Sequence, residues 1–147
     1  MWNLEPFSKL LQMSMLPVVL ISAAGLLLLS ITNRLGRTID RSREIAREIG
    51  AGAALDRASD KEQLNVLVRR AGLLRSCATF VALSILFSSF MILGLFLLVF
   101  AGWATQTLVL ACFFLSVVSL ILSLAYFIVD IFVGLKALEL DVAKYIR

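Results

Sequence analysis

Hydrophobic residues fill two long stretches of this chain, and charged residues are confined to the segments around them. The 54 residues from Ser76 to Val129 contain no Asp, Glu, Lys, Arg or His, and 10–32 is a second uncharged apolar run. A helix needs about 20 apolar residues to cross the hydrocarbon core of a bilayer. We therefore predict two crossings for the longer run and one for the shorter, in an all-α integral membrane protein with three transmembrane helices.

Breaks in the apolar pattern divide this single membrane domain into parts. Pro17 is predicted to begin or kink the first span, and the polar residues near Gly102 separate the second span from the third. The predicted parts are an interfacial segment over 1–15, spans over 16–33, 76–100 and 108–135, a polar segment over 34–75 and a tail over 136–147.

The first two spans are predicted to continue as helices beyond the membrane. Apolar residues over 28–49 recur mostly every three or four positions, which is the spacing of a helix. Gly50 ends this helix, and Ser59 with Glu62 forms a capping-box pattern that starts the next one. Segment 34–75 is therefore predicted to form a helical hairpin in the cytoplasm.

The distribution of charge predicts the orientation of the chain. Segment 34–75 contains ten of the 14 Lys and Arg residues, whereas 101–107 contains none and the tail contains three. Because Lys and Arg gather on the cytoplasmic side of spans, we expect the hairpin and the tail in the cytoplasm and the N-terminus outside. The net charge of +4 is thus explained by basic residues next to the spans. We therefore do not expect nucleic acid as a partner.

No arrangement of residues typical of an enzyme is present in the sequence. The chain contains no His, no Gly-rich phosphate loop and no pair of closely spaced cysteines. We therefore predict no catalytic residues, no cofactor and no metal site.

Small residues in the spans are interpreted as packing positions. Ser84 with Ser88, and Ser119 with Ser123, are spaced four apart and predict faces where helices approach closely. Cys77 is interpreted in the same way, as a small buried residue. The other cysteine, in the third span, is predicted to lie too far from Cys77 for a disulfide.

One face of the first helix becomes polar as it leaves the apolar run. The candidates for lining a pore on this face are Ser22, Leu29, Asn33, Arg37 and Asp40. Copies of the helix around an axis would bring these residues together, and rings of Arg37 and Asp40 would favour ions of opposite sign. The simpler interpretation of Asn33 is a hydrogen bond between helices.

Asp130 lies within the last apolar run, about one to two turns from its end. Charged side chains at this depth are costly and are usually paired. The candidate partners are Arg34, Arg75 or another arginine of segment 34–75, which would fasten the third span to the hairpin. A proton or cation site is the alternative interpretation.

The first span also resembles part of a known family of small bacterial membrane proteins of unknown function. The residues that carry the resemblance are Pro17, Ser22, Leu26 to Leu29 and Thr32-Asn33-Arg34. In that family Thr-Asn-Arg ends the first helix, and a basic loop and two further spans follow. Ala23-Ala24-Gly25 departs from the family pattern by separating the serine from the leucines. The resemblance implies three spans in a bacterial inner membrane and implies no activity.

Two functions fit these features. Three spans leave little room for a pathway within one subunit, so the first hypothesis is a homo-oligomeric ion channel or pore lined by the first helix. The second is a non-conducting scaffold or accessory subunit that presents segment 34–75 to a cytoplasmic protein partner. The lipid bilayer is a partner in both, and attraction between the basic segment and anionic headgroups is a third, generic role.

Overall fold

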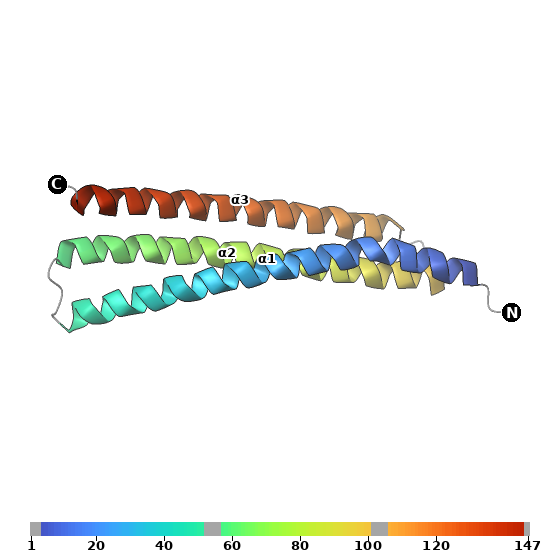
Figure 1. The fold of residues 1–147 in the computed structure, drawn as a ribbon. Coiled ribbons are helices and arrows are strands. Elements are labelled where there is room, and N and C mark those ends of the chain that lie inside the picture. Colours follow the sequence, from blue (N-terminus) through green and yellow to red (C-terminus); the bar gives the residue numbers. More distant parts are fainter. Residues whose placement is uncertain (1–3, 52–56, 101–105, 146–147) are drawn as a thin grey trace. The chain divides into compact units, whose positions relative to one another are not determined.

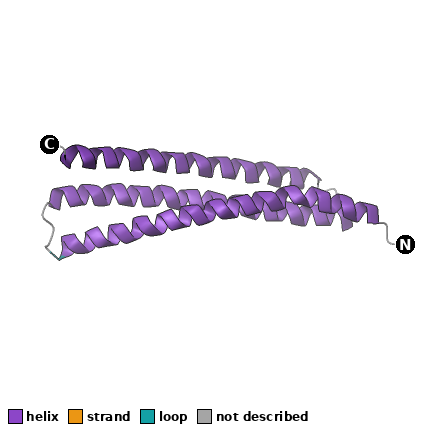
Figure 2. Ribbon diagram, in the orientation of Figure 1, coloured by secondary structure: helices purple, strands orange, loops and turns teal. Residues whose placement is uncertain are grey.

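The described part of the protein consists of three long α-helices. The computed structural model describes residues 4–51, 57–100 and 106–145, and these residues contain no strand. The helices are α1 (Leu4–Gly50), α2 (Arg57–Phe100) and α3 (Gln106–Tyr145) (Figures 1 and 2). Each contains a stretch long and apolar enough to cross a membrane. The predictions of an all-α class and of three membrane helices are confirmed.

The helices extend beyond the apolar runs on which the spans were based. α1 begins at Leu4 and continues through Pro17 as one helix, rather than beginning there. α2 begins at Arg57, ahead of the predicted cap at Ser59, and α3 continues through most of the predicted tail to Tyr145. The features predicted at 1–3, 52–56, 101–105 and 146–147 lie outside the described residues.

The three helices contribute to two compact units. The first unit contains the described residues of 1–29 and 79–122, and the second contains those of 30–78 and 123–147. Each unit therefore takes one segment from each helix.

Buried positions recur along each helix with the spacing of a heptad. On α1 they occur at every seventh residue, at Pro17, Ala24, Ile31, Thr38 and Ile45. On α2 they alternate by three and four residues from Leu74 through Cys77, Val81, Ser84 and Ser88. This spacing is typical of helices that pack side by side at small crossing angles. Within each unit, one narrow seam of each helix is thus covered by its neighbours.

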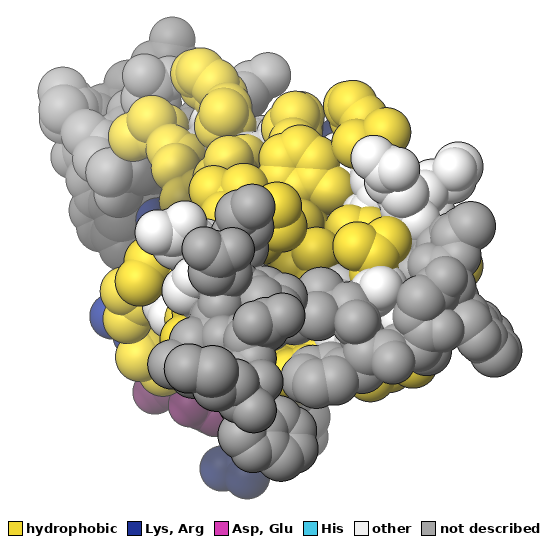
Figure 3. Space-filling view, turned by 90° about the vertical axis from the view of Figure 1, so that its right-hand side faces the viewer, with side chains coloured by type: hydrophobic (Ala, Val, Ile, Leu, Met, Phe, Trp, Pro, Cys, Tyr) yellow, Lys and Arg dark blue, Asp and Glu magenta, His cyan; other side chains and the backbone are white. Residues whose placement is uncertain are grey.

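The remaining surface of the spans is apolar and open. Large exposed hydrophobic residues include Leu26, Phe90, Leu110, Phe114 and Phe132. Hydrophobic side chains also dominate the described residues on the face shown in Figure 3. A soluble protein rarely leaves so much contiguous apolar surface open to water. This surface is that of a multi-pass membrane protein in a lipid bilayer.

Gly94 allows α2 and α3 to approach closely in the first unit. A Cβ atom at this position would lie 2.8 Å from Val109 Cγ2, and valine has little freedom at χ1. We expect Gly94→Ala to lower the free energy of unfolding by about 1 kcal/mol, measured by SDS titration of the protein in detergent. The control is Gly25→Ala on α1, where no atom lies within 4 Å of the new Cβ. Equal losses in both variants would contradict a specific close contact at Gly94.

Candidate functional site

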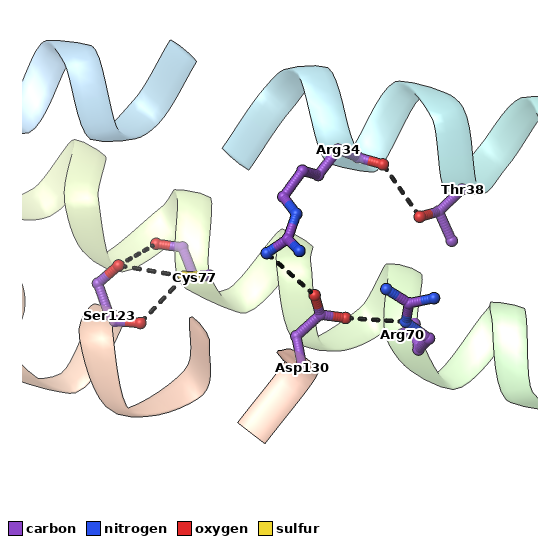
Figure 4. A network of polar contacts seen from close by, with 6 residues as sticks. All are labelled: Arg34, Thr38, Arg70, Cys77, Ser123 and Asp130. Carbon is purple, nitrogen blue, oxygen red and sulfur yellow. Dashed lines mark hydrogen bonds and ion pairs between the residues drawn. The ribbon is translucent and has the colours of Figure 1, made fainter. Parts of the chain in front are cut away.

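A buried ionic cluster in the second unit joins all three helices. Asp130 on α3 has a fully buried side chain, and Arg70 on α2 donates a hydrogen bond from Nε to Asp130 Oδ1 at 3.2 Å. Arg34 on α1 forms an ion pair with the same carboxylate, with 3.9 Å between Nη1 and Oδ2 (Figure 4). One carboxylate therefore connects α1, α2 and α3 at this level.

Neighbours of Asp130 on α3 position the two guanidinium groups. Phe127, one turn before Asp130, lies under Arg34, with 5.0 Å between Arg34 Cζ and the ring centroid. This geometry is that of a cation–π contact. Gly134, one turn after Asp130, leaves space for Arg70, because a Cβ there would lie 3.0 Å from Arg70 Nη2. α3 thus contributes the carboxylate of Asp130, the aromatic ring of Phe127 and, at Gly134, the space that Arg70 occupies.

The cluster contains more positive than negative charge. Two guanidinium groups face one carboxylate, and within the described residues Asp130 Oδ2 accepts no hydrogen bond. The side chain of Arg34 is 33% exposed and that of Arg70 is 24% exposed. Two adjacent positive charges disfavour a second cation at this carboxylate. The arrangement is therefore better suited to an anion than to the proton or cation site considered as the alternative for Asp130.

The structure brings together two of the three residues predicted to form an ion pair. Asp130 and Arg34 lie in one cluster, its second arginine is Arg70, which is another arginine of segment 34–75, and Arg75 is an exposed residue of α2. The helical period explains the difference, because Arg70 lies on the same face of α2 as the buried residues Leu74 and Cys77. Extending that face backwards from the second span would have identified Arg70.

Cys77 packs against α3 within the second unit. Its thiol donates a hydrogen bond to the Ser123 carbonyl at 3.0 Å, and Ser123 Oγ donates one to the Cys77 carbonyl at 3.0 Å (Figure 4). Both side chains are fully buried. The contact is a reciprocal link between two helix backbones, in agreement with a packing role for Cys77.

Serine residues form the corresponding contact in the first unit. Ser116 Oγ donates to the Ser84 carbonyl at 3.0 Å and lies 3.1 Å from Ser84 Oγ and 2.7 Å from Ser88 Oγ. All three serines are buried. Small hydroxyl residues let membrane helices approach closely and then bond across the interface. This polar cluster is uncharged, and its role is packing.

The five pore-lining candidates all lie on exposed parts of α1. Ser22 and Leu29 belong to the first unit, and Asn33, Arg37 and Asp40 belong to the second. The Ser22 hydroxyl donates to the Val18 carbonyl of its own helix at 3.0 Å. None of the five faces the buried seam of α1.

Arg41 and Glu44, which also lie beyond the apolar run of α1, are exposed. Arg41 forms an ion pair with Glu44 at 2.6 Å, and this hydrogen bond raises the pKa of the Arg41 guanidinium.

In the parts of the chain that the structure describes, no three His, Cys, Asp or Glu residues are grouped so that they could hold a metal ion.

Comparison with known proteins identifies one family. A family model described as a protein of unknown function (DUF2721) matches residues 14–140, which is most of the chain. No curated protein matches the chain. No solved structure matches it either. The family description assigns no enzymatic activity.

Proposed function

The chain belongs to the DUF2721 family of proteins of unknown function, and from its exposed polar face on α1 we propose a homo-oligomeric ion pore with α1 innermost. The observation that supports the proposal lies in the second unit. Asn33, Arg37 and Asp40 are exposed, whereas Thr38 and Ile45 of the same helix are buried. The neighbouring helices thus leave the polar side of α1 open to other copies of the chain.

The proposal includes an orientation and a membrane. The basic ends of α1 and α2 and the end of α3 face the cytoplasm, and the N-terminus faces outside, because basic flanks are retained on the cytoplasmic side. The membrane is the bacterial inner membrane that the sequence resemblance implies. Segment 34–75 then forms a cytoplasmic extension of the pore, in which Arg37 is the first charged residue among the pore-lining candidates.

Arg37→Glu is expected to shift the ion selectivity of the pore towards cations. A ring of positive charge is replaced by a ring of negative charge at the mouth of the pathway. The measurement is the reversal potential in a salt gradient, with purified protein in planar bilayers. Native mass spectrometry of the same protein should show one defined oligomer of at least three copies.

The matched control is Arg69→Glu, which makes the same charge change at an exposed position on α2. It should leave the reversal potential within a few millivolts of the wild-type value. A monomer or dimer in mass spectrometry, or equal shifts in the two variants, would overturn the proposal that α1 lines a pore.

The exposed charges of the second unit favour a second candidate, a non-conducting scaffold or accessory subunit. The Arg41–Glu44 pair lies on open surface, where ion pairs add little stability, so its charges are available to a cytoplasmic protein. A monomeric, non-conducting protein would favour this candidate. Its own test is a pull-down whose yield falls when Arg41 and Glu44 are exchanged in the full chain.

A further inference from the structure

The cluster around Asp130 carries a net positive charge, unlike a simple ion pair. Two guanidinium groups are held beside one carboxylate, so one positive charge is left uncompensated within the described cluster. Among the described residues of the second unit, basic side chains also outnumber acidic ones. The electrostatic potential is therefore positive where the two arginine side chains are exposed.

Most hydrogen-bond donors of the two arginines remain available. Each guanidinium has five N–H donors in a planar fork. Within the described residues, Arg70 donates only from Nε to Asp130, and Arg34 lies 3.9 Å from the carboxylate, too far for a hydrogen bond. Because both side chains are partly exposed, whereas Asp130 is fully buried, a ligand would meet the guanidinium groups and not the carboxylate.

Both arginines are also held in place before any ligand binds. Asp130 attracts both groups, Phe127 lies under Arg34, and Gly134 gives Arg70 its position. A long side chain that is already ordered loses less conformational entropy on binding. The two guanidinium groups therefore form a preorganised pair.

The cluster lies near the ends of the apolar runs of the three helices. Arg34 follows the apolar run of 10–32, Arg70 precedes the run that starts at Ser76, and Asp130 lies about one to two turns before the end of the predicted span 108–135. The headgroup layer that contains the lipid phosphates lies directly outside the hydrocarbon core. Basic pockets between membrane helices at this level are suited to anionic headgroups.

We propose that Arg34 and Arg70, positioned by Asp130, bind a phosphate group at the membrane boundary, with an anionic lipid headgroup as its source. Guanidinium groups match phosphate in shape and bind it through paired N–H donors. Asp130 is a positioning residue in this site. The inference is independent of the pore, since it concerns groups on the buried side of α1 and makes no use of Asn33, Arg37 or Asp40.

The test is the binding of phosphatidylglycerol to the full chain in an uncharged detergent, and native mass spectrometry measures the lipid-bound fraction. We expect Arg34→Gln and Arg70→Gln each to weaken binding about tenfold, the effect of losing about 1.4 kcal/mol of binding free energy. The control Arg69→Gln removes a neighbouring exposed charge on α2 and should change binding by less than about twofold. Equal weakening in all three variants would overturn the proposal, because it would indicate general attraction to a basic surface.

A second variant tests the site without changing any charge. Gly134→Ala places a Cβ 3.0 Å from Arg70 Nη2, so the end of a flexible side chain must move while the backbone stays in place. It should weaken phosphatidylglycerol binding several-fold, whereas Gly72→Ala, with no atom within 4 Å of the new Cβ, should not. Wild-type binding in Gly134→Ala would overturn the site even where an arginine variant fails to fold.

A parallel titration with inorganic phosphate distinguishes the source of the phosphate group. Protection from thermal unfolding by the lipid alone, lost in Arg34→Gln and Arg70→Gln, would support a headgroup site. Equal protection by millimolar inorganic phosphate, lost in the same variants, would keep the site but overturn the assignment to lipid. No protection by either compound would overturn the proposal.

Discussion

Asp130→Asn is expected to lower the free energy of unfolding by about 3 kcal/mol, at the low end of the range for breaking a buried ion pair. Asparagine keeps the shape of the side chain but removes the only negative charge described beside Arg34 and Arg70. The two guanidinium groups then repel each other across the junction of α1, α2 and α3. The loss is not larger because both arginines are partly exposed and stay partly solvated.

SDS titration of the purified protein, with helicity followed by circular dichroism, measures this loss. Asp40→Asn is the matched control, because it removes an exposed carboxylate on α1 and should change stability by less than about 0.5 kcal/mol. Combining Asp130→Asn with Arg70→Gln should cost less than the sum of the two single changes, because the residues share one interaction. Strict additivity, or a stable Asp130→Asn protein, would show that the cluster does not hold the helices together.

The three spans and the importance of Asp130 could be predicted from the sequence because both depend on the cost of burial in lipid. A run of uncharged residues long enough to cross a bilayer has few alternative structures in that environment. A carboxylate within such a run needs a partner for the same reason. These inferences require no knowledge of which helix faces which.

The buried seam of each helix was much harder to predict. On α1 the positions at every seventh residue hold Pro17, Ala24, Ile31, Thr38 and Ile45, which differ in size and shape and include one hydroxyl residue. In a soluble helix the buried face is apolar and the open face is polar, but in a membrane the open face is apolar as well. Hydrophobicity therefore did not distinguish the two faces within the span, and the arginine of α2 that pairs with Asp130 was left open among those of segment 34–75.

The extent of α3 shows a signal that was present in the sequence but not used. Residues 135–147 contain no Gly or Pro, and eight of the thirteen are Leu, Ala, Lys or Glu, which favour helices. The predicted tail was based on the end of the apolar run, but the end of a run marks where a helix leaves lipid and does not terminate the helix. α3 accordingly continues to Tyr145.

The polar groups buried in the two units differ in a way that follows their surroundings. The first unit has neutral hydroxyl groups, in which Ser116 bonds to Ser84 and Ser88. The second has the charged cluster of Asp130 near the ends of the apolar runs. A hydroxyl pair can be satisfied within a hydrocarbon environment, whereas a group of three charges is less costly where water is near. The charged cluster is therefore better placed for ligand binding and the neutral one for packing.

Ser116→Leu is expected to lower the free energy of unfolding by about 3 kcal/mol, at the upper end of the range for overpacking a well-packed site. The leucine side chain would enter the narrow contact between α2 and α3 and would leave the hydroxyls of Ser84 and Ser88 without their partner. Ser116→Ala removes the hydrogen bonds without adding volume and should cost only about 1 kcal/mol. The same SDS titration measures both changes.

Ser89→Leu is the matched control for this prediction. Ser89 lies on the exposed side of α2, and its hydroxyl donates to the Ile85 carbonyl of its own helix at 2.9 Å. A leucine there would face lipid, so stability should be unchanged or slightly higher. If Ser116→Leu were also tolerated, α2 and α3 would not pack through Ser84, Ser88 and Ser116. A large loss of stability in Ser116→Leu alone would show that the contact of Ser84, Ser88 and Ser116, and not general hydrophobicity, determines how α2 and α3 pack.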